Sequence, residues 1–397
     1  MIKRNIVILF FIYAIAWCVM AIAFSATASV GHRMAPDKAL ILLPLIMQVF
    51  GAVAISFPAS MIMRRLGRRG GFMVGGVIGA IGASLCAYSI FQQNFWLLIC
   101  STPILGMFNG FGELAKFAAA EVYDNKKQQS RAISIVVSGG IVAAFIGPTI
   151  ASVSNHHFAH LGDYFGPYGA AVVLCSLSLL LASFLHRTNR EWSQDKDATD
   201  TFVATRQVLA NPVFIVATAI AAIGYLVMSA MMDGMPITML ENNMDFSDTT
   251  VVLQWHMLAM FAPSYLTAKI IEKYGIPATV FCGIALNVIG LVSALSGVEF
   301  HHFWIGLFAI GLGWNLMYLG GTTLLTRIAE AEKPKAEGMN NLVIMGCFAI
   351  AAPIVAIILN YLGWAAVSYF SFGLLLVAVV LLLNFVQMNP YRTEKTR

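Results

Sequence analysis

The strongest candidates for chemistry are two oppositely charged side chains, Glu113 and Lys116, inside an apolar stretch from residue 96 to 119. Residues three positions apart lie on one face of a helix, so these two can form a pair. A charge within hydrocarbon costs about 2.5 to 3.5 kcal/mol on insertion scales, which makes buried charges functional candidates. Glu113 is expected to carry a coupling proton or to recognise a charged solute. Lys116 either pairs with Glu113 or snorkels toward the aqueous interface.

A lone histidine, His256, lies in a second apolar stretch, residues 250 to 270. Because imidazole gains and loses protons near neutral pH, His256 is a candidate for proton exchange or solute contact. The alternative is a structural histidine that is satisfied within the fold. An internal repeat that lays Gly67 on Gly275 also sets Gln48 opposite His256, so both polar side chains are candidates to face a shared cavity.

Aromatic and amide side chains near the middle of other apolar stretches form a third group of candidates. Such side chains can orient a polar solute by hydrogen bonds and stacking. Amides also bridge neighbouring helices without any contact to solute. The group comprises Tyr13, Trp17, Asn109, Tyr225, Trp314, Asn315 and Tyr318.

The composition places these residues in a membrane protein. Of the 397 residues, 59% are hydrophobic and 11% are charged, whereas a soluble globular chain carries about 25% charged residues. The apolar residues come in blocks of roughly 20, which is enough to cross about 30 Å of hydrocarbon. The net charge of +5 arises from short clusters between these blocks and forms no continuous basic stripe. We therefore predict a lipid bilayer and not nucleic acid as the macromolecular environment.

Hydropathy and turn residues predict an all-α integral membrane protein with twelve spanning helices. The polar segment 187–210 separates two sets of six, so residues 1–186 and 211–397 are predicted to form two six-helix bundles. The expected spans are 5–27, 39–62, 71–92, 96–119, 132–153, 167–186, 211–232, 250–270, 277–296, 302–326, 339–359 and 364–387.

The distribution of basic residues predicts that both termini and the central loop are cytoplasmic. With this orientation, only Arg33 and Lys38 of the 24 Lys and Arg residues fall in outer loops, and Lys116 lies within a span. Positive residues beside short loops are retained on the cytoplasmic side, and the reverse orientation would invert this distribution.

No sequence pattern indicates catalysis or a bound cofactor. The chain has no Walker loop, no HExxH pattern and no nucleophile elbow. Its six cysteines lie inside apolar blocks without ligand spacing. We predict that the protein is not an enzyme and holds no cofactor or metal.

The segment from Ser60 to Arg69, SMIMRRLGRR, carries a family resemblance. It is similar to the GxxxDRxGRR loop of the major facilitator superfamily, of which it keeps Arg65, Gly67, Arg68 and Arg69. It departs at Ser60, where the family has glycine, and at Arg64, where the family has aspartate. In the family that acid helps to latch the inward gate at a neighbouring helix end. The resemblance therefore implies that the latch of this chain is different or weaker.

A second element, Gly147-Pro148 in the fifth predicted span, is similar to the Gly-Pro element that exporters of the family often carry. Proline removes a backbone donor and glycine permits close helix approach, giving a kink that a gate can use. The alternative is a kink that serves packing only.

The resemblance implies secondary active transport of a small solute across the bacterial inner membrane by alternating access. It also implies a cavity lined by spans one, four, seven and ten. We expect proton coupling, a small-molecule substrate and a monomer. The alternatives are export of a drug or metabolite, uptake of an iron–siderophore or vitamin-like molecule, and a membrane sensor that does not transport.

Overall fold

The computed structural model describes residues 3–37, 40, 43–158, 160, 164–186, 205–244, 246–329 and 332–388. Lys38 and residues 187–204 of the predicted central loop lie outside the described residues. Within the described residues the regular structure is helical, as the hydropathy pattern predicts.

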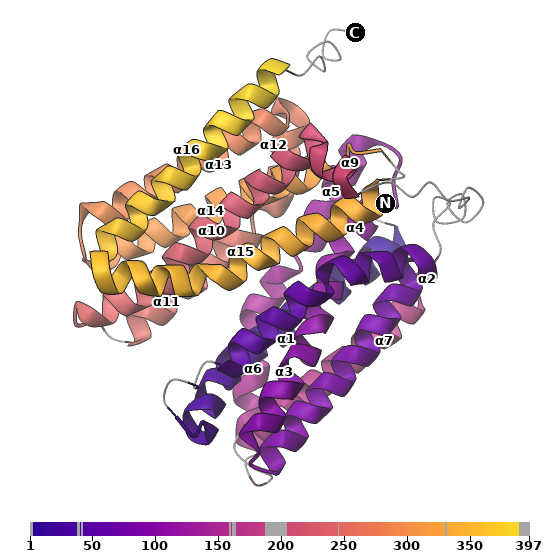
Figure 1. Cartoon of the computed structure of the whole chain (residues 1–397), viewed down its shortest axis with the longest axis vertical. Helices are drawn as coiled ribbons and strands as arrows, with labels where there is room; N and C mark the ends of the chain where they lie inside the picture. Colours follow the sequence, from indigo (N-terminus) through magenta and orange to yellow (C-terminus); the bar gives the residue numbers. More distant parts are fainter. Residues whose placement is uncertain are drawn as a thin grey trace. The chain divides into compact units, whose positions relative to one another are not determined.

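Within each half of the chain, the helices follow one another with short connections (Figure 1). In the first half of the chain they are α1 (Arg4–Met34), α2 (Leu43–Phe91), α3 (Phe95–Glu113), α4 (Ala115–Ala120), α5 (Lys126–Val137), α6 (Gly140–His157) and α7 (Phe165–Ser183). In the second half they are α9 (Thr205–Ala210), α10 (Pro212–Glu241), α11 (Phe246–Phe261), α12 (Ser264–Tyr274), α13 (Ile276–Ser296), α14 (Phe300–Leu325), α15 (Lys333–Leu362) and α16 (Trp364–Met388).

The helices accommodate the twelve predicted spans. Ten helical segments of the described residues are long and apolar enough to cross a membrane. One of them, α2, has 49 residues, roughly 70 Å at 1.5 Å per residue, so it holds two spans. The predicted eighth span is divided into α11 and α12 at Pro263, which leaves only a short apolar segment, Val251–Phe261.

Two glycines that the internal repeat aligns share one backbone conformation. Gly67 has φ 73° and ψ 168° where α2 bends between its two spans. Gly275 has φ 85° and ψ 169° between α12 and α13. This region of backbone space is essentially restricted to glycine. The two matching kinks support the duplication that the sequence indicates.

The described helices form two compact units. The first consists of Met1–Val203 together with Ala329–Ala349, and the second of Ala204–Ile328 together with Ile350–Arg397. The helix α15 is thus shared, because its first residues pack in the first unit and its later residues in the second.

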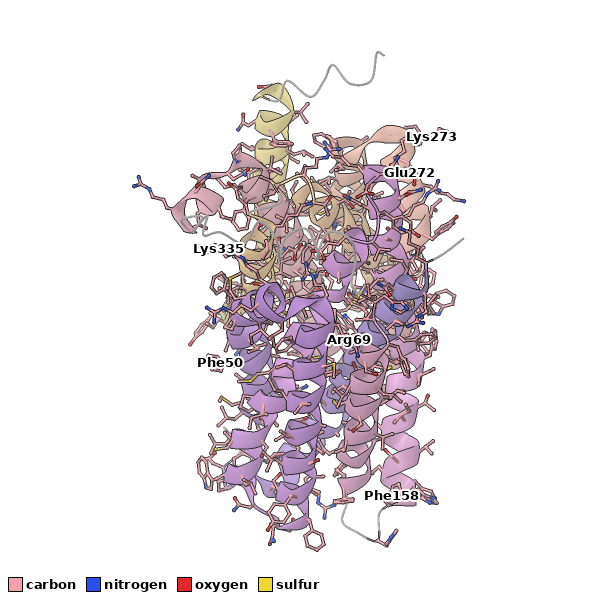
Figure 2. The ribbon with its side chains drawn as sticks, turned by 90° about the vertical axis from the view of Figure 1, so that its right-hand side faces the viewer. Phe50, Arg69, Phe158, Glu272, Lys273 and Lys335 are labelled. Carbon is pink, nitrogen blue, oxygen red and sulfur yellow. The ribbon has the colours of Figure 1, made fainter. Side chains whose placement is uncertain are left out.

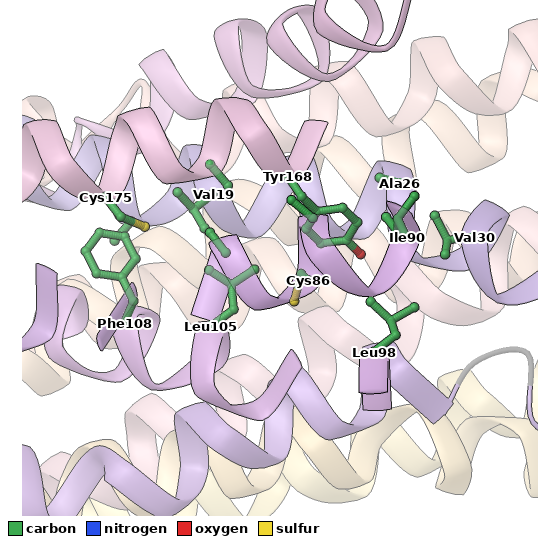
Figure 3. Close-up of a cluster of buried hydrophobic side chains, with 14 of the residues drawn as sticks. Val19, Ala26, Val30, Cys86, Ile90, Leu98, Leu105, Phe108, Tyr168 and Cys175 are labelled. Carbon is green, nitrogen blue, oxygen red and sulfur yellow. The ribbon is translucent and has the colours of Figure 1, made fainter. Parts of the chain in front are cut away.

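Small and aromatic side chains fill the core of the first unit (Figure 3). Phe108 and Leu105 of α3 pack with Cys86 of α2 and Cys175 of α7. A Cβ atom at Gly82 of α2 would overlap the backbone of Leu105, so the two helices touch through their main chains. Such close approach is the way in which membrane helices gain packing contacts when lipid is as apolar as their side chains.

In the second unit the central element is α14. It contacts α10, α11, α12 and α13, and almost every residue from 306 to 325 is buried. Aromatic and amide side chains of α14 therefore point into protein on nearly every side.

Large apolar side chains cover the outside of the molecule. Phe50 of α2 and Phe158 after α6, both labelled in Figure 2, are exposed, and so are Val173, Tyr361 and Leu376. A water-soluble protein rarely leaves extended apolar surface open. Exposed apolar surface of this extent is what the composition predicts for a protein in a lipid bilayer.

Candidate functional site

The carboxylate of Glu113 receives two hydrogen bonds in the first unit. Trp17 donates from Nε1 to Oε1 over 2.8 Å, and Lys116 donates from Nζ to Oε2 over 2.7 Å. The Lys116 side chain is fully buried. The interpretation that Lys116 snorkels to the interface is therefore wrong, and the pair that the i, i+3 spacing predicts is present.

The helix ends explain how this pair is positioned. α3 ends at Glu113, Leu114 makes a turn, and α4 begins at Ala115, so the pair spans a break in the fourth predicted span. Asn109, one turn earlier, donates from Nδ2 to the carbonyl oxygen of Ala16 over 2.6 Å and ties α3 to α1. The next residue of α1 is Trp17, which is thereby held beside Glu113.

Two more sequence candidates lie on or against the same stretch of α1. Tyr13 is fully buried, and its ring centroid lies 6.2 Å from that of Trp17. Gln48 of α2 is buried as well, and its Nε2 atom lies 3.9 Å from the sulfur of Met20 in α1. Tyr13, Trp17, Asn109 and Glu113 form one polar and aromatic group around α1, with Gln48 beside it.

Four aromatic rings form a second cluster, in the second unit. Trp314 and Tyr318 of α14 are stacked, with centroids 4.8 Å apart and an interplanar angle of 14°. The ring of Tyr225 in α10 meets both at steep angles, over 5.2 Å and 5.4 Å. Phe261 at the end of α11 meets Trp314 over 5.7 Å. Phe261 was not among the residues predicted from the sequence, although its place two positions before Pro263 was a signal.

The amide of Asn315 and the indole of Trp314, both in α14, differ in their hydrogen bonding. Asn315 donates from Nδ2 to the Met260 carbonyl and to Ser264 Oγ, over 2.6 Å and 2.8 Å, and accepts from Thr267 over 2.6 Å. It thus fastens the break between α11 and α12. Trp314 Nε1 is buried and has no acceptor among the described residues. An unpaired buried donor is costly, so Trp314 is the better candidate for contact with solute.

His256 of α11 is fully buried against α14. Its Nδ1 atom lies 2.7 Å from the carbonyl oxygen of Leu307, while its Nε2 atom has no partner in the part of the chain that the structure describes. The histidine is therefore half satisfied, and neither of the two alternatives from the sequence describes it fully.

In the segment between spans two and three, Arg68 forms ion pairs with two acids. Its guanidinium binds Glu121, over 2.6 Å and 3.0 Å, and also Glu337 of α15, over 2.6 Å. Arg65 and Arg69 are exposed, as is Arg64 where the family pattern has an acid. The start of α15 also lies close to α2 here. A Cβ atom at Gly338 would overlap Ser60 Oγ.

Sequence reasoning missed Glu121 and Glu337. Both lie beside predicted cytoplasmic loops that are otherwise basic, and that contrast was the available signal. Both acids come from the ends of other helices and bind Arg68.

The Gly147-Pro148 element lies inside α6. A Cβ atom at Gly147 would come within 2.7 Å of the Ala21 side chain of α1. This glycine therefore permits close packing of α6 on α1, which agrees with the packing alternative.

One group of described side chains has metal-ligating atoms within 4.8 Å of one another, namely Glu299, His301 and His302. Glu299 and His302 already form a capping box at the start of α14. Helix capping therefore accounts for the proximity of these two side chains.

Comparison with known proteins shows to which family the chain belongs. The family model described as Major Facilitator Superfamily matches residues 8–276 and 234–397. The chain belongs to this family. It is therefore a multi-pass membrane transporter with a small-molecule substrate, and its fold is the fold of the Major Facilitator Superfamily.

Among curated relatives in this superfamily, the riboflavin transporter RfnT of Brucella anthropi is 30% identical over 394 residues, or 98% of this chain and 96% of the relative. Two solved members match with a TM-score of 0.70. They are the fucose:proton symporter FucP of E. coli, at 18% identity over 96% of this chain and 98% of that one, and the human organic anion transporter MFSD10, at 13% identity over 96% and 100%. At this identity, the two structures establish the fold alone.

Proposed function

We propose that this superfamily member carries riboflavin, or a closely related planar heterocyclic vitamin, across the bacterial inner membrane. The observation that carries the proposal is the cluster of Tyr225, Phe261, Trp314 and Tyr318. The relationship to RfnT along nearly the whole of both chains supports it. Of the alternatives from the sequence, uptake of a vitamin-like molecule fits these two observations.

The cluster suits a flat ring system for two reasons. Aromatic faces stack on a planar heterocycle, and Trp314 Nε1 offers a buried donor for a carbonyl of that ring. Riboflavin presents a three-ring plane with two carbonyl groups, so it can use both the faces and the donor.

The rings pack on one another in the described conformation, and solute must separate them. Aromatic pairs contribute about 0.5 to 1.5 kcal/mol each beyond the burial of their area. A planar solute that inserts beside Trp314 replaces a ring–ring contact by a ring–solute contact of the same kind. The exchange therefore costs little, and the closed cluster is compatible with an open, solute-bound one.

We propose that transport is driven by the proton gradient through Glu113. This carboxylate is an acidic sequence candidate buried in the first unit, with 4% of its surface exposed. Protonation would neutralise Glu113 and weaken its charge-assisted bond to Lys116, whose buried charge would then lose this partner. Alternating access, cytoplasmic termini and a monomeric state belong to the same proposal.

The test is uptake of labelled riboflavin by proteoliposomes that contain the purified protein, with and without an imposed pH gradient. We expect saturable uptake that the gradient increases. Trp314→Phe keeps an aromatic ring and removes the donor, and should raise KM about tenfold, the equivalent of one lost hydrogen bond.

The matched control is Trp304→Phe, a second tryptophan of α14 that stacks on Phe308 outside the cluster. It should leave KM unchanged. Absence of riboflavin flux in either direction would reject the proposed substrate, and gradient-dependent efflux of a drug panel would favour the export alternative.

A further inference from the structure

The hydrogen bond of His256 defines which ring nitrogen carries its proton. A carbonyl oxygen can only accept, so Nδ1 must donate to Leu307 O across the 2.7 Å contact. A neutral imidazole has one N–H group. The Nε2 atom consequently presents a lone pair, and it is an acceptor only.

This acceptor is held in a fixed place. α11 and α14 are so close here that a Cβ atom at Gly311 would lie 2.8 Å from the His256 carbonyl and 3.1 Å from its Nδ1 atom. The ring is fully buried and its orientation is set by the Leu307 bond. The Nε2 lone pair is nevertheless left without a donor among the described residues.

The position of His256 connects it to the aromatic cluster. Gly311, which His256 touches, precedes Trp314 by three residues, or about one helical turn of α14. Phe261, on the same helix as His256, contacts the Trp314 ring. Among the described residues, the two helices therefore carry aromatic rings, a donor at Trp314 and an acceptor at His256 that have no partner, all within the same unit.

We propose that His256 Nε2 accepts the imide N–H of the transported heterocycle and selects solutes that carry this group. The inference rests on the proposed function and specifies which edge of the heterocycle the protein recognises. The pyrimidinedione ring of riboflavin has an N–H group between two carbonyls. A donor and an acceptor in the protein complement a carbonyl and an N–H group in the solute. A site built to bond such a group rejects an analogue that lacks it, because its own polar atom stays buried and unpaired.

The first experiment needs no variant. Uptake of riboflavin and of 3-methylriboflavin, in which a methyl group replaces the imide hydrogen, is measured as kcat/KM in proteoliposomes. We expect a preference for riboflavin of at least about tenfold, the equivalent of one hydrogen bond. Equal transport of both compounds overturns the inference and leaves the proposed function intact. No transport of riboflavin rejects the proposed function itself.

A pair of variants separates recognition from packing. In His256→Asn the amide nitrogen can still donate to Leu307 O, but no atom remains at the Nε2 position. In His256→Gln the longer amide can place an acceptor near that position. We expect the Asn variant to keep the thermal midpoint of the wild type and to lose the preference, with the ratio falling to about one. The Gln variant should keep part of the preference.

Retention of the full preference by a folded Asn variant overturns the inference. Loss of gradient-driven accumulation with the preference unchanged would assign His256 to proton exchange instead. If the Asn variant does not fold, the comparison of the two solutes in the wild type still decides.

Discussion

At the scale of single residues, the hydrogen bonds that Glu113 accepts from Trp17 and Lys116 determine the expected effect of replacing it. The carboxylate neutralises Lys116, whose side chain is fully buried, and it also accepts from Trp17. Removing one member of a buried pair leaves the other as an uncompensated charge. Structural and coupling roles of Glu113 must therefore be separated by a second substitution.

We predict that Glu113→Gln lowers stability by about 3 to 5 kcal/mol, seen as a reduced thermal midpoint in detergent. Glu113→Gln combined with Lys116→Met should recover most of the loss, because no buried charge remains. If Glu113 also carries the coupling proton, the double variant will exchange riboflavin down its gradient but will not accumulate it in response to pH. Full proton-driven accumulation by the double variant would exclude a coupling role.

At the scale of elements, the kinks at Gly67 and Gly275 end one span and begin the next. Each replaces a loop by a single residue with positive φ and extended ψ. Residues with a Cβ atom adopt this region at a cost of about 1 to 3 kcal/mol. The two kinks also set the direction in which α2 and α13 continue. A change of backbone conformation at either glycine would therefore displace the helices on both sides of it.

We predict that Gly67→Ala and Gly275→Ala each lower the thermal midpoint, and that Gly67→Ala also slows transport by displacing Arg68. The matched control is Gly373→Ala in α16, where a Cβ atom meets no other atom within 4 Å. Because alanine favours the helix over glycine by about 1 kcal/mol, the control should be neutral or stabilising. A Gly67→Ala variant as stable as the control would show that the kink is not required.

At the scale of the whole molecule, α15 belongs to two units at once. Its first residues lie in the first unit, where Glu337 binds Arg68 and Gly338 packs on Ser60. Asn341, one turn further, donates to Ser56 Oγ of α2 over 3.0 Å. An ion pair, a close backbone contact and a hydrogen bond therefore join α2 to the start of α15.

We predict that Glu337→Gln weakens this contact and exposes the start of α15. In a background without native cysteines, alkylation of Ala336→Cys by an aqueous maleimide should become about tenfold faster, since a hydrogen bond to a charged partner is lost. Arg65→Gln, an exposed residue of the same loop, is the control and should leave the rate unchanged. An unchanged rate in the Glu337 variant would mean that the Asn341–Ser56 hydrogen bond and the packing of Gly338 on Ser60 suffice to hold the contact.

Composition and local periodicity determined the environment and the elements of this protein. Blocks of about 20 apolar residues must become helices in lipid, because each backbone group has to be satisfied within its own segment. The same reasoning at short range predicted the Glu113–Lys116 pair and the equivalence of Gly67 and Gly275. These features depend on neighbours a few positions apart, or on a pattern that repeats along the chain.

Only the tertiary structure decided which polar groups are satisfied. Trp17 binds Glu113 across 96 positions. The amide of Asn315 is hydrogen-bonded at the break near Pro263, whereas Trp314 beside it has no acceptor among the described residues. Arg68 binds Glu337 across 269 positions. A hydrogen bond depends on distance and direction between atoms that packing brings together, and neither quantity is encoded in residue type or spacing.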